Sequence, residues 1–310
     1  MHLFLHFYDS IATTMKKKVV VVVGSTAVGK SDIAVAIATA CNGEVVSADS
    51  RQVYTGLDIG TGKITPKEMR GIPHHLLDVA DAKDVFTAHD FVVHGRIAIN
   101  DIVNRNKLPV IAGGTGFYID ALLGVVSLPE VPENLSLRKE LSQLSTEELY
   151  SKLETLDSER AKTIDAKNKV RLVRAIEIAM FLGGVPPLKE QEIFDVLYVG
   201  ISLPSELLYE KIKNRLKARA ENGMIEEVKN LHKRGLSYER MESLGLEYRY
   251  IARFLKKELS YEKMMFELEK EIVKYAKRQK TWFKKNIDIQ WFEPTEVEKI
   301  LTEVQRFVQN

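Results

Sequence analysis

Cysteine is nearly absent from this chain of 310 residues, which contains only Cys41. One cysteine cannot form an intramolecular disulfide, and it excludes a zinc site built from several cysteines. Proteins of a reducing compartment do not depend on disulfides. We therefore expect the protein to work in the cytoplasm.

An excess of charge of either sign is also missing. Lys and Arg number 45 and Asp and Glu number 43, so the formal net charge is +2. A nucleic-acid partner would therefore have to be bound through local basic patches.

Long hydrophobic runs are missing as well. No stretch approaches the ~20 apolar residues of a membrane helix, and we expect no membrane partner. Residues 1–14 lack the basic start and long apolar stretch of a signal peptide. Met15, followed by three lysines, is a candidate second start, so we expect residues 1–14 to be disordered or loosely docked.

The first third of the chain alternates strand and helix patterns. The β-branched run at 19–23 predicts a buried parallel strand. Apolar residues at helical spacing follow at 31–40. The alternation continues with a strand at 44–48, a helix at 86–104 and a strand at 109–112. This order predicts an α/β fold with a parallel sheet.

The pattern changes after residue 123. A linker with prolines is followed by purely helical patterns over 135–182. A strand pattern returns at 197–203, then helical sequence to about residue 285 and a short strand at 287–292. We predict a core made of residues 15–123 and 193–310, with C-terminal helices, and a helical insertion at 124–192.

The strongest motif lies between the first strand and the first helix. It fits G-x-x-x-x-G-K-[ST] in the context that this pattern requires, and it comprises Gly24, Ser25, Thr26, Ala27, Val28, Gly29, Lys30 and Ser31. Backbone N–H groups and the helix N-terminus would bind a phosphate, Lys30 would add a full charge, and Ser31 could hold Mg²⁺. The motif predicts a P-loop NTPase-like core that binds a di- or triphosphate, without specifying ATP.

Asp49 is the acid expected nearest to this phosphate loop. An ATPase usually carries an acid after an apolar strand, but the strand at 109–112 ends in Gly-Gly-Thr-Gly. Asp49 follows the second strand, and the carboxyl ends of neighbouring parallel strands share one crevice. Asp49 could be a Mg²⁺ ligand, a general base or a partner of Lys30, or it could only cap a helix.

Several segments resemble the bacterial tRNA dimethylallyltransferases, the IPP transferase family. Four of them read SADSRQVY at 47–54, GLDIGTGK at 56–63, IPHHL at 72–76 and GGTGFY at 113–118. Two more, RLVRAIE at 171–177 and AKRQKTWF at 276–283, resemble the family's insertion helix and its C-terminal basic motif. The similarity spans about residues 17–292.

The resemblance implies transfer of the dimethylallyl group of dimethylallyl diphosphate to N6 of adenosine 37, 3′ of the anticodon in tRNA. Asp49 would be the general base, Thr115 would touch the substrate, and Arg215 would reach the diphosphate, with Mg²⁺ on Ser31. The insertion at 124–192 would bind the anticodon stem-loop. The residues implied in tRNA binding are Asp49, Ser50, Arg51, Gln52, Arg171, Arg174, Lys277, Arg278 and Gln279.

Elementary chemistry is consistent with these roles. Diphosphate leaves readily once Mg²⁺, Lys30 and loop amides neutralise it. The amine of adenine is a poor nucleophile, so a carboxylate at hydrogen-bond distance would remove its proton. An adenine in a stacked loop must flip out to reach such a pocket.

Two segments depart from the family pattern. A His-Pro-Asn-Asp-like stretch is replaced by IDAKNK at 164–169, and a Gly-Tyr-Lys/Arg-Glu/Gln motif by LGLEYR at 244–249. We expect both segments to lie where tRNA contacts the protein.

Some residues have two interpretations. The basic residues near 274–285 could contact RNA or form a solvated face. Trp282 and Phe283 are expected in the core rather than stacked on bases. His74 and His75 could line the cleft or lie on the surface.

Three other functions fit parts of the pattern. A small-molecule kinase also combines a phosphate loop with an acid, but we find no lid pattern. A prenyltransferase acting on free adenine nucleotides would need neither the insertion nor the basic helix. A regulatory nucleotide switch that binds RNA would have no use for Asp49. We expect a monomer.

Overall fold

The computed structural model describes residues 16–126, 128–186 and 193–310. The expectation for residues 1–14 lies outside these ranges. The chain forms two compact units, one made of Met1–Leu123 and Glu192–Asn310 and the other of Gly124–Gln191. No helix within the described residues combines the length and apolarity needed to cross a membrane.

A six-stranded sheet organises the first unit, in the order β3-β2-β4-β1-β5-β6. Every neighbouring pair is parallel. The strands are β1 (Lys17–Gly24), β2 (Gly43–Ala48), β3 (His74–His75), β4 (Leu108–Gly113), β5 (Phe194–Ile201) and β6 (Gln290–Phe292). The α/β, P-loop NTPase-like fold predicted from the sequence is therefore confirmed.

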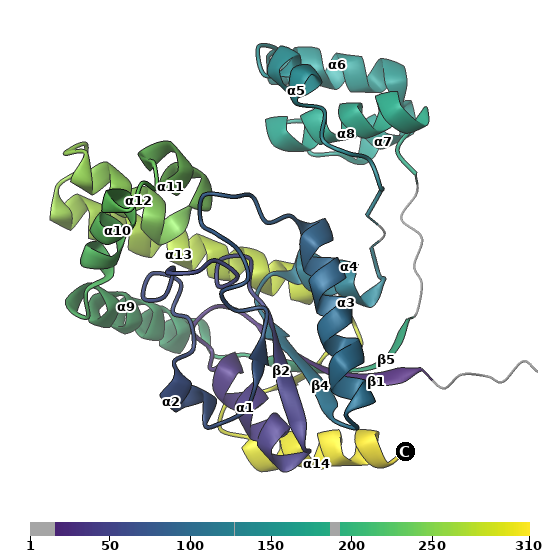
Figure 1. Ribbon diagram of the computed structural model, residues 1–310, viewed down its shortest axis with the longest axis vertical. Coiled ribbons are helices and arrows are strands. Elements are labelled where there is room, and N and C mark those ends of the chain that lie inside the picture. Colours follow the sequence, from purple (N-terminus) through teal and green to yellow (C-terminus); the bar gives the residue numbers. More distant parts are fainter. Residues whose placement is uncertain (1–15, 127, 187–192) are drawn as a thin grey trace, which may run out of the picture. The chain divides into compact units, whose positions relative to one another are not determined.

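The valines of β1 explain how both faces of this sheet are covered. Successive strand residues point to opposite faces. Val20 and Val22 join one hydrophobic cluster, with residues of α1 (Lys30–Ala40) and α14 (Val297–Gln309). Val19, Val21 and Val23 join the other, with residues of α3 (Ala88–Asn104) and α4 (Gly116–Leu123). These two pairs of helices thus cover opposite faces of the sheet (Figure 1).

The C-terminal part of this unit is helical. It contains α9 (Ser205–Glu221), α10 (Met224–Lys233), α11 (Tyr238–Leu244), α12 (Leu246–Leu255) and the long α13 (Tyr261–Phe283). The buried residues of α13 recur every three or four positions, as an amphipathic helix requires. They are Met264, Leu268, Ile272, Ala276, Gln279 and Phe283.

The second unit is helical throughout its described elements. They are α5 (Leu135–Leu141), α6 (Thr146–Leu156), α7 (Ser158–Thr163) and α8 (Lys169–Leu182). Leucines of α5, α6 and α8 form its core, including Leu141, Leu149 and Leu172. A carboxylate, Glu177, is buried beside this core.

Some boundaries differ from the predictions. β5 begins at Phe194 instead of 197, because Phe194 pairs with Lys17 at the start of β1. β6 is shorter than predicted, because only Gln290–Phe292 pairs with β5 and Ile287 is 93% exposed. The short α2 (Pro66–Met69) and β3 were not predicted.

Candidate active site

A cavity of about 660 Å³ lies at the carboxyl ends of β1, β2 and β4. Its wall combines the phosphate loop, the segment after β2, the loop around 58–65 and parts of α9 and α13. The lining residues used below are Lys30, Ser31, Asp49, Gln52, Arg215, Arg219, Tyr275 and Gln279. The carboxyl edge of the sheet is where ligands bind in folds of this kind.

The phosphate loop has the backbone that its glycines predict. Gly29, which precedes α1, has φ 98°, a conformation that favours glycine. The amino group of Lys30 donates to the carbonyl oxygen of Ser25 at 2.7 Å. Burial, reinforced by the nearby charge of Arg215, lowers the pKa of Lys30 to about 8, although Asp49 partly opposes this shift. A bound anion would act in the opposite direction and favour the charged form of Lys30.

Gln279 of α13 forms hydrogen bonds with both the phosphate loop and the turn at the end of β4. Its side-chain oxygen accepts from the N–H of Thr26 at 2.7 Å, and its amide nitrogen donates to the carbonyl oxygen of Gly114 at 2.9 Å. Gln279 is 5% exposed. Its predicted role in tRNA binding is therefore not supported, because both ends of the amide are used within the protein.

The turn at 113–116 needs glycine for close packing. A Cβ atom at Gly113 would lie 2.1 Å from the carbonyl oxygen of Ala48. One at Gly114 would lie 2.1 Å from the amide nitrogen of Gln279, and one at Gly116 would lie 2.3 Å from the ring of Trp282. The GGTG motif thus lets β2, β4 and α13 meet beside the cavity.

Asp49 caps a turn, not a helix. Its Oδ1 accepts from the N–H groups of Arg51 at 2.8 Å and Gln52 at 3.4 Å. No ion pair joins Asp49 to Lys30 among the described residues: Lys30 donates to the carbonyl oxygen of Ser25, and Asp49 acts on it only through its nearby charge. In the part of the chain that the structure describes, no group donates to the second carboxylate oxygen. Asp49 therefore offers one oriented basic oxygen next to the cavity.

Thr115 lies behind this wall. Its hydroxyl accepts from the N–H of Ser50 at 3.1 Å, and its own N–H donates to the carbonyl oxygen of Ala48 at 3.2 Å. The hydroxyl is also hydrogen-bonded to the phenol of Tyr275, whose pKa is raised by burial. These contacts link the turn after β4 to the segment that carries Asp49.

Arg215 reaches the phosphate loop from α9. Its Nη2 donates to the hydroxyl of Thr26 at 2.5 Å. Burial, with the nearby charge of Arg219, lowers the pKa of Arg215 to about 10. Two guanidinium groups close to one another at a cavity wall are suited to an anion with several charges.

Two charged residues at or beside the cavity, Arg219 and Glu247, were not predicted from the sequence. Arg219 lines the same cavity as Arg215, and the buried Glu247 lies beside it. The i, i+4 spacing of the two arginines was a usable signal, because such residues share a helix face. Glu247 and Tyr248 are buried, so the expectation that 244–249 contacts tRNA is wrong for these two residues.

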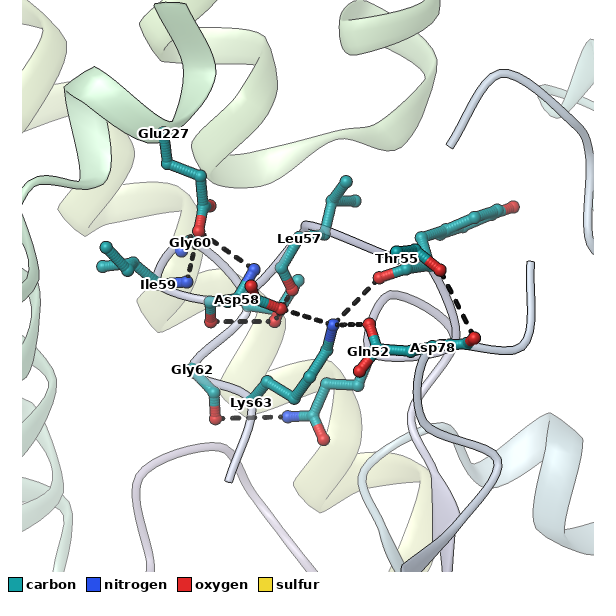
Figure 2. Close-up of polar contacts among 12 residues, drawn as sticks. Gln52, Thr55, Leu57, Asp58, Ile59, Gly60, Gly62, Lys63, Asp78 and Glu227 are labelled. Carbon is teal, nitrogen blue, oxygen red and sulfur yellow. Dashed lines mark hydrogen bonds and ion pairs between the residues drawn. The ribbon is translucent and has the colours of Figure 1, made fainter. Parts of the chain in front are cut away.

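A loop at 57–63 forms another part of the wall (Figure 2). The carboxylate of Glu227 accepts from three successive N–H groups, those of Asp58, Ile59 and Gly60, at 2.6–3.0 Å. Lys63 closes the loop with ion pairs to Asp58 at 2.6 Å and Asp78 at 2.5 Å. These contacts hold the backbone of the GLDIGTGK segment in place beside the cavity.

The predicted basic residues lie in different settings. Lys277 and Arg278 are exposed on α13, and Arg171 is exposed on α8. Arg174 pairs with the buried Glu177 and donates to the carbonyl oxygen of Val131 at 2.9 Å, which is a structural contact. Residues 164–169 lie at the junction of α7 and α8.

The structure also gives the burial and contacts of the aromatic pair Trp282–Phe283 and of the two histidines, His74 and His75. Phe283 is buried, and Trp282 is partly buried and donates to Asp120 at 2.9 Å, as expected for core residues. His74 lines the cavity, whereas His75 binds the buried Glu44 at 2.8 Å. The two histidines thus face different surroundings, although both belong to β3.

Comparisons with known proteins show the family of this chain. The model of the IPP transferase family matches residues 52–286. The chain is 43% identical to tRNA dimethylallyltransferase 1 of Geotalea uraniireducens, over 87% of this chain and 89% of that protein. It is 37% identical to tRNA dimethylallyltransferase of Bacillus mycoides, over 95% of each.

Solved structures give the same result. The full-length tRNA isopentenylpyrophosphate transferase of Bacillus halodurans matches with a TM-score of 0.73 at 32% identity, over 95% of this chain and 97% of that one. A eukaryotic dimethylallyltransferase acting on tRNA matches with a TM-score of 0.82 at 25% identity, over 95% of this chain and 80% of that one. The resemblance noted in the sequence is therefore confirmed, and the chain belongs to the IPP transferase family.

Proposed function

We propose that this protein transfers the dimethylallyl group from dimethylallyl diphosphate to N6 of adenosine 37, 3′ of the anticodon in tRNA, and releases diphosphate. The observation that carries the proposal is that a phosphate loop and the carboxylate of Asp49 line one cavity of about 660 Å³. The names of the relatives, tRNA dimethylallyltransferases, support the same reaction.

The proposed step is a substitution at the first carbon of the dimethylallyl group. The N6 lone pair forms the new C–N bond while the C–O bond to diphosphate breaks, and the diphosphate leaves with the electron pair. The second oxygen of Asp49 takes the proton from N6. The N–H groups of Arg51 and Gln52 hold the first oxygen and so orient the second.

The diphosphate would be bound by the phosphate loop and by cations. Loop amides and the N-terminus of α1 point toward an anion at this position. Lys30 and Arg215 add charge from two sides of the cavity. We assign Thr115 a positioning role, because it joins Ser50 and Tyr275 behind Asp49.

Mg²⁺ fits the chemistry of this wall. Ser31 and the carboxylates of Asp32 and Asp49 line the cavity and offer the oxygen ligands that Mg²⁺ prefers. The described residues contain no group of three or more His, Cys, Asp or Glu that could hold a metal by themselves, so phosphate oxygens and water would complete the coordination. The ion would neutralise part of the charge on the leaving diphosphate.

The tRNA would be bound by exposed residues of both units. Lys277 and Arg278 of α13 and Arg171 of the second unit are candidates for phosphate contacts. Residues 49–52 would contact the flipped adenosine beside Asp49. We propose that unit Gly124–Gln191 binds the anticodon stem-loop, and that the protein acts as a monomer in the cytoplasm.

One labelling experiment tests the proposal against its alternatives. The protein is incubated with labelled dimethylallyl diphosphate or ATP, and with unmodified tRNA or AMP. Label in tRNA from dimethylallyl diphosphate supports the proposal. Labelled AMP would indicate a free-nucleotide prenyltransferase, phosphate transfer from ATP a kinase, and no labelled product a regulatory switch, and each of these results would contradict the proposal.

A further inference from the structure

α9 presents three cations to the cavity, and the proposed chemistry uses only one of them. Lys211, Arg215 and Arg219 follow one another at intervals of four residues, and all three line the cavity. This spacing places them along one face of the helix. Arg215 touches the phosphate loop. Lys211 is exposed, whereas the Arg219 side chain is only 13% exposed, so the role of Arg219 is the one to be explained.

The backbone of the loop at 57–63 is shaped around the Arg219 guanidinium. Nη1 donates to the carbonyl oxygen of Gly60 at 3.1 Å. A Cβ atom at Gly62 would lie 1.6 Å from Nη2, so only a glycine leaves room for the guanidinium there. Glu227 holds the same loop through the N–H groups of residues 58–60 (Figure 2).

Glu247 balances the Arg219 charge only in part. Its Oε1 lies 3.5 Å from Nη1, the long end of hydrogen-bond distances, and both side chains are nearly buried, at 11% and 13% exposed. Burial raises the pKa of Glu247 and so disfavours its charged form. Burial, together with the nearby charge of Arg219, lowers the pKa of Arg215, so the two guanidinium groups lie close enough to repel one another.

Nearly buried like charges destabilise a protein unless an anion compensates them. Lys30, Arg215 and Arg219 line one cavity, and the acids whose charges act on Lys30 and Arg215 are Asp49 and Glu247. A diphosphate carries enough negative charge to meet all three cations. The geometry therefore favours a diphosphate over a ligand with a single charge.

We propose that Arg219 is a second guanidinium that binds the diphosphate group, held ready beside Arg215 by the carbonyl oxygen of Gly60 and the carboxylate of Glu247. This inference rests on the proposed function, since it assigns a further residue to the diphosphate of the same site. The competing explanation is that Arg219 only neutralises Glu247.

The test uses inorganic diphosphate as the probe in a set of variants. R219Q should raise the inhibition constant of diphosphate about tenfold or more, as expected for loss of a charge-assisted contact. It should raise the KM for dimethylallyl diphosphate similarly and leave tRNA affinity unchanged. The matched control is K217Q, because Lys217 lies on the same helix with its side chain 76% exposed, and it should behave like the wild type.

The double variant R219Q/E247Q separates the two explanations. It removes the buried acid together with its partner, so its melting temperature should return toward that of the wild type. If Arg219 binds diphosphate, the inhibition constant stays raised in the double variant. If the inhibition constant of the double variant falls to within about threefold of the inhibition constant of the single variant E247Q, Arg219 is only structural and the inference is wrong.

Failure of this inference is distinguishable from failure of the proposed function. If the wild type transfers the prenyl group but R219Q binds diphosphate normally, the inference alone is wrong. If the wild type binds diphosphate through Arg219 but modifies no tRNA, the proposed function is wrong and the inference about diphosphate remains.

Discussion

Replacing Asp49 with Asn removes a base while keeping the shape of its surroundings. The side-chain oxygen of Asn can still accept from the N–H groups of Arg51 and Gln52, which lie 2.8 and 3.4 Å from Oδ1. The turn after β2 should therefore persist, and the variant should melt close to the wild type. What is lost is the second carboxylate oxygen, the proposed acceptor of the N6 proton.

The size of the effect follows from this loss. Removing a general base typically slows a reaction by ~10²–10⁴, which corresponds to ~2.7–5.5 kcal/mol in the activation free energy. Asp49 also favours the charged form of Lys30 and lies near Arg215. Loss of its negative charge should leave diphosphate affinity unchanged or increased, because one repulsive charge is removed from the anion site.

The assay is a single-turnover measurement with excess enzyme, labelled dimethylallyl diphosphate and unmodified tRNA. D49A should be slowed as much as D49N but should also lose the turn hydrogen bonds, which lowers its melting temperature by about 2–4 °C per kcal/mol lost. D84N is the control, since Asp84 is exposed and does not line the cavity. A D49N variant that keeps more than about a tenth of the wild-type rate would refute the role of general base.

Three further predictions concern binding and packing. Lys30→Met should weaken diphosphate binding about tenfold or more. It should also raise the melting temperature at pH 7, because it removes a cation whose pKa is lowered by burial. In the wild type, the affinity for diphosphate should fall above pH about 8 as Lys30 loses its proton. Calorimetry and melting curves check both, and an affinity independent of pH between 7 and 9.5 would contradict the role of Lys30. Arg278→Ala should weaken all tRNAs similarly and flatten the log–log salt dependence by about one unit; unchanged affinity at several salt concentrations would show a solvated residue, and a lower melting temperature a structural one. Gly114→Ala should displace Gln279 from the phosphate loop, because the new Cβ atom would lie 2.1 Å from its amide nitrogen; a raised KM for dimethylallyl diphosphate is expected, and wild-type kinetics would refute the bracing role of Gln279.

Local patterns account for the features that could be predicted from the sequence. The valine run of β1 and the phosphate loop are contiguous, and the order of strands and helices constrains a parallel sheet to few topologies. The position of Asp49 followed from that topology, because the carboxyl ends of β1 and β2 share one edge. Only the family resemblance implies the proposed roles of Arg215 and Thr115, which no local pattern indicates.

Long-range contacts account for most of what was missed. Arg219, Gly60 and Glu247 lie far apart in the sequence, and only folding brings their charges together. The resemblance of residues 276–283 to the family's basic motif implies a tRNA contact for Gln279, although the spacing of Ile272, Ala276, Gln279 and Phe283 is that of a buried helix face. The helical spacing predicts that Gln279 is buried, and Gln279 is buried in the structure. Arg174 similarly lies three residues from Glu177, a spacing that favours an ion pair.

The most direct test of the central claim is nucleoside analysis of tRNA after reaction with the purified protein. Unmodified tRNA carrying adenosine 37 is incubated with dimethylallyl diphosphate and Mg²⁺, digested, and examined by mass spectrometry. We expect N6-dimethylallyladenosine, located at position 37 by fragment analysis and formed about a hundredfold or more slowly when D49N replaces the wild type. An unmodified adenosine 37 with active wild-type protein, or prenylation of a different nucleotide, would contradict it.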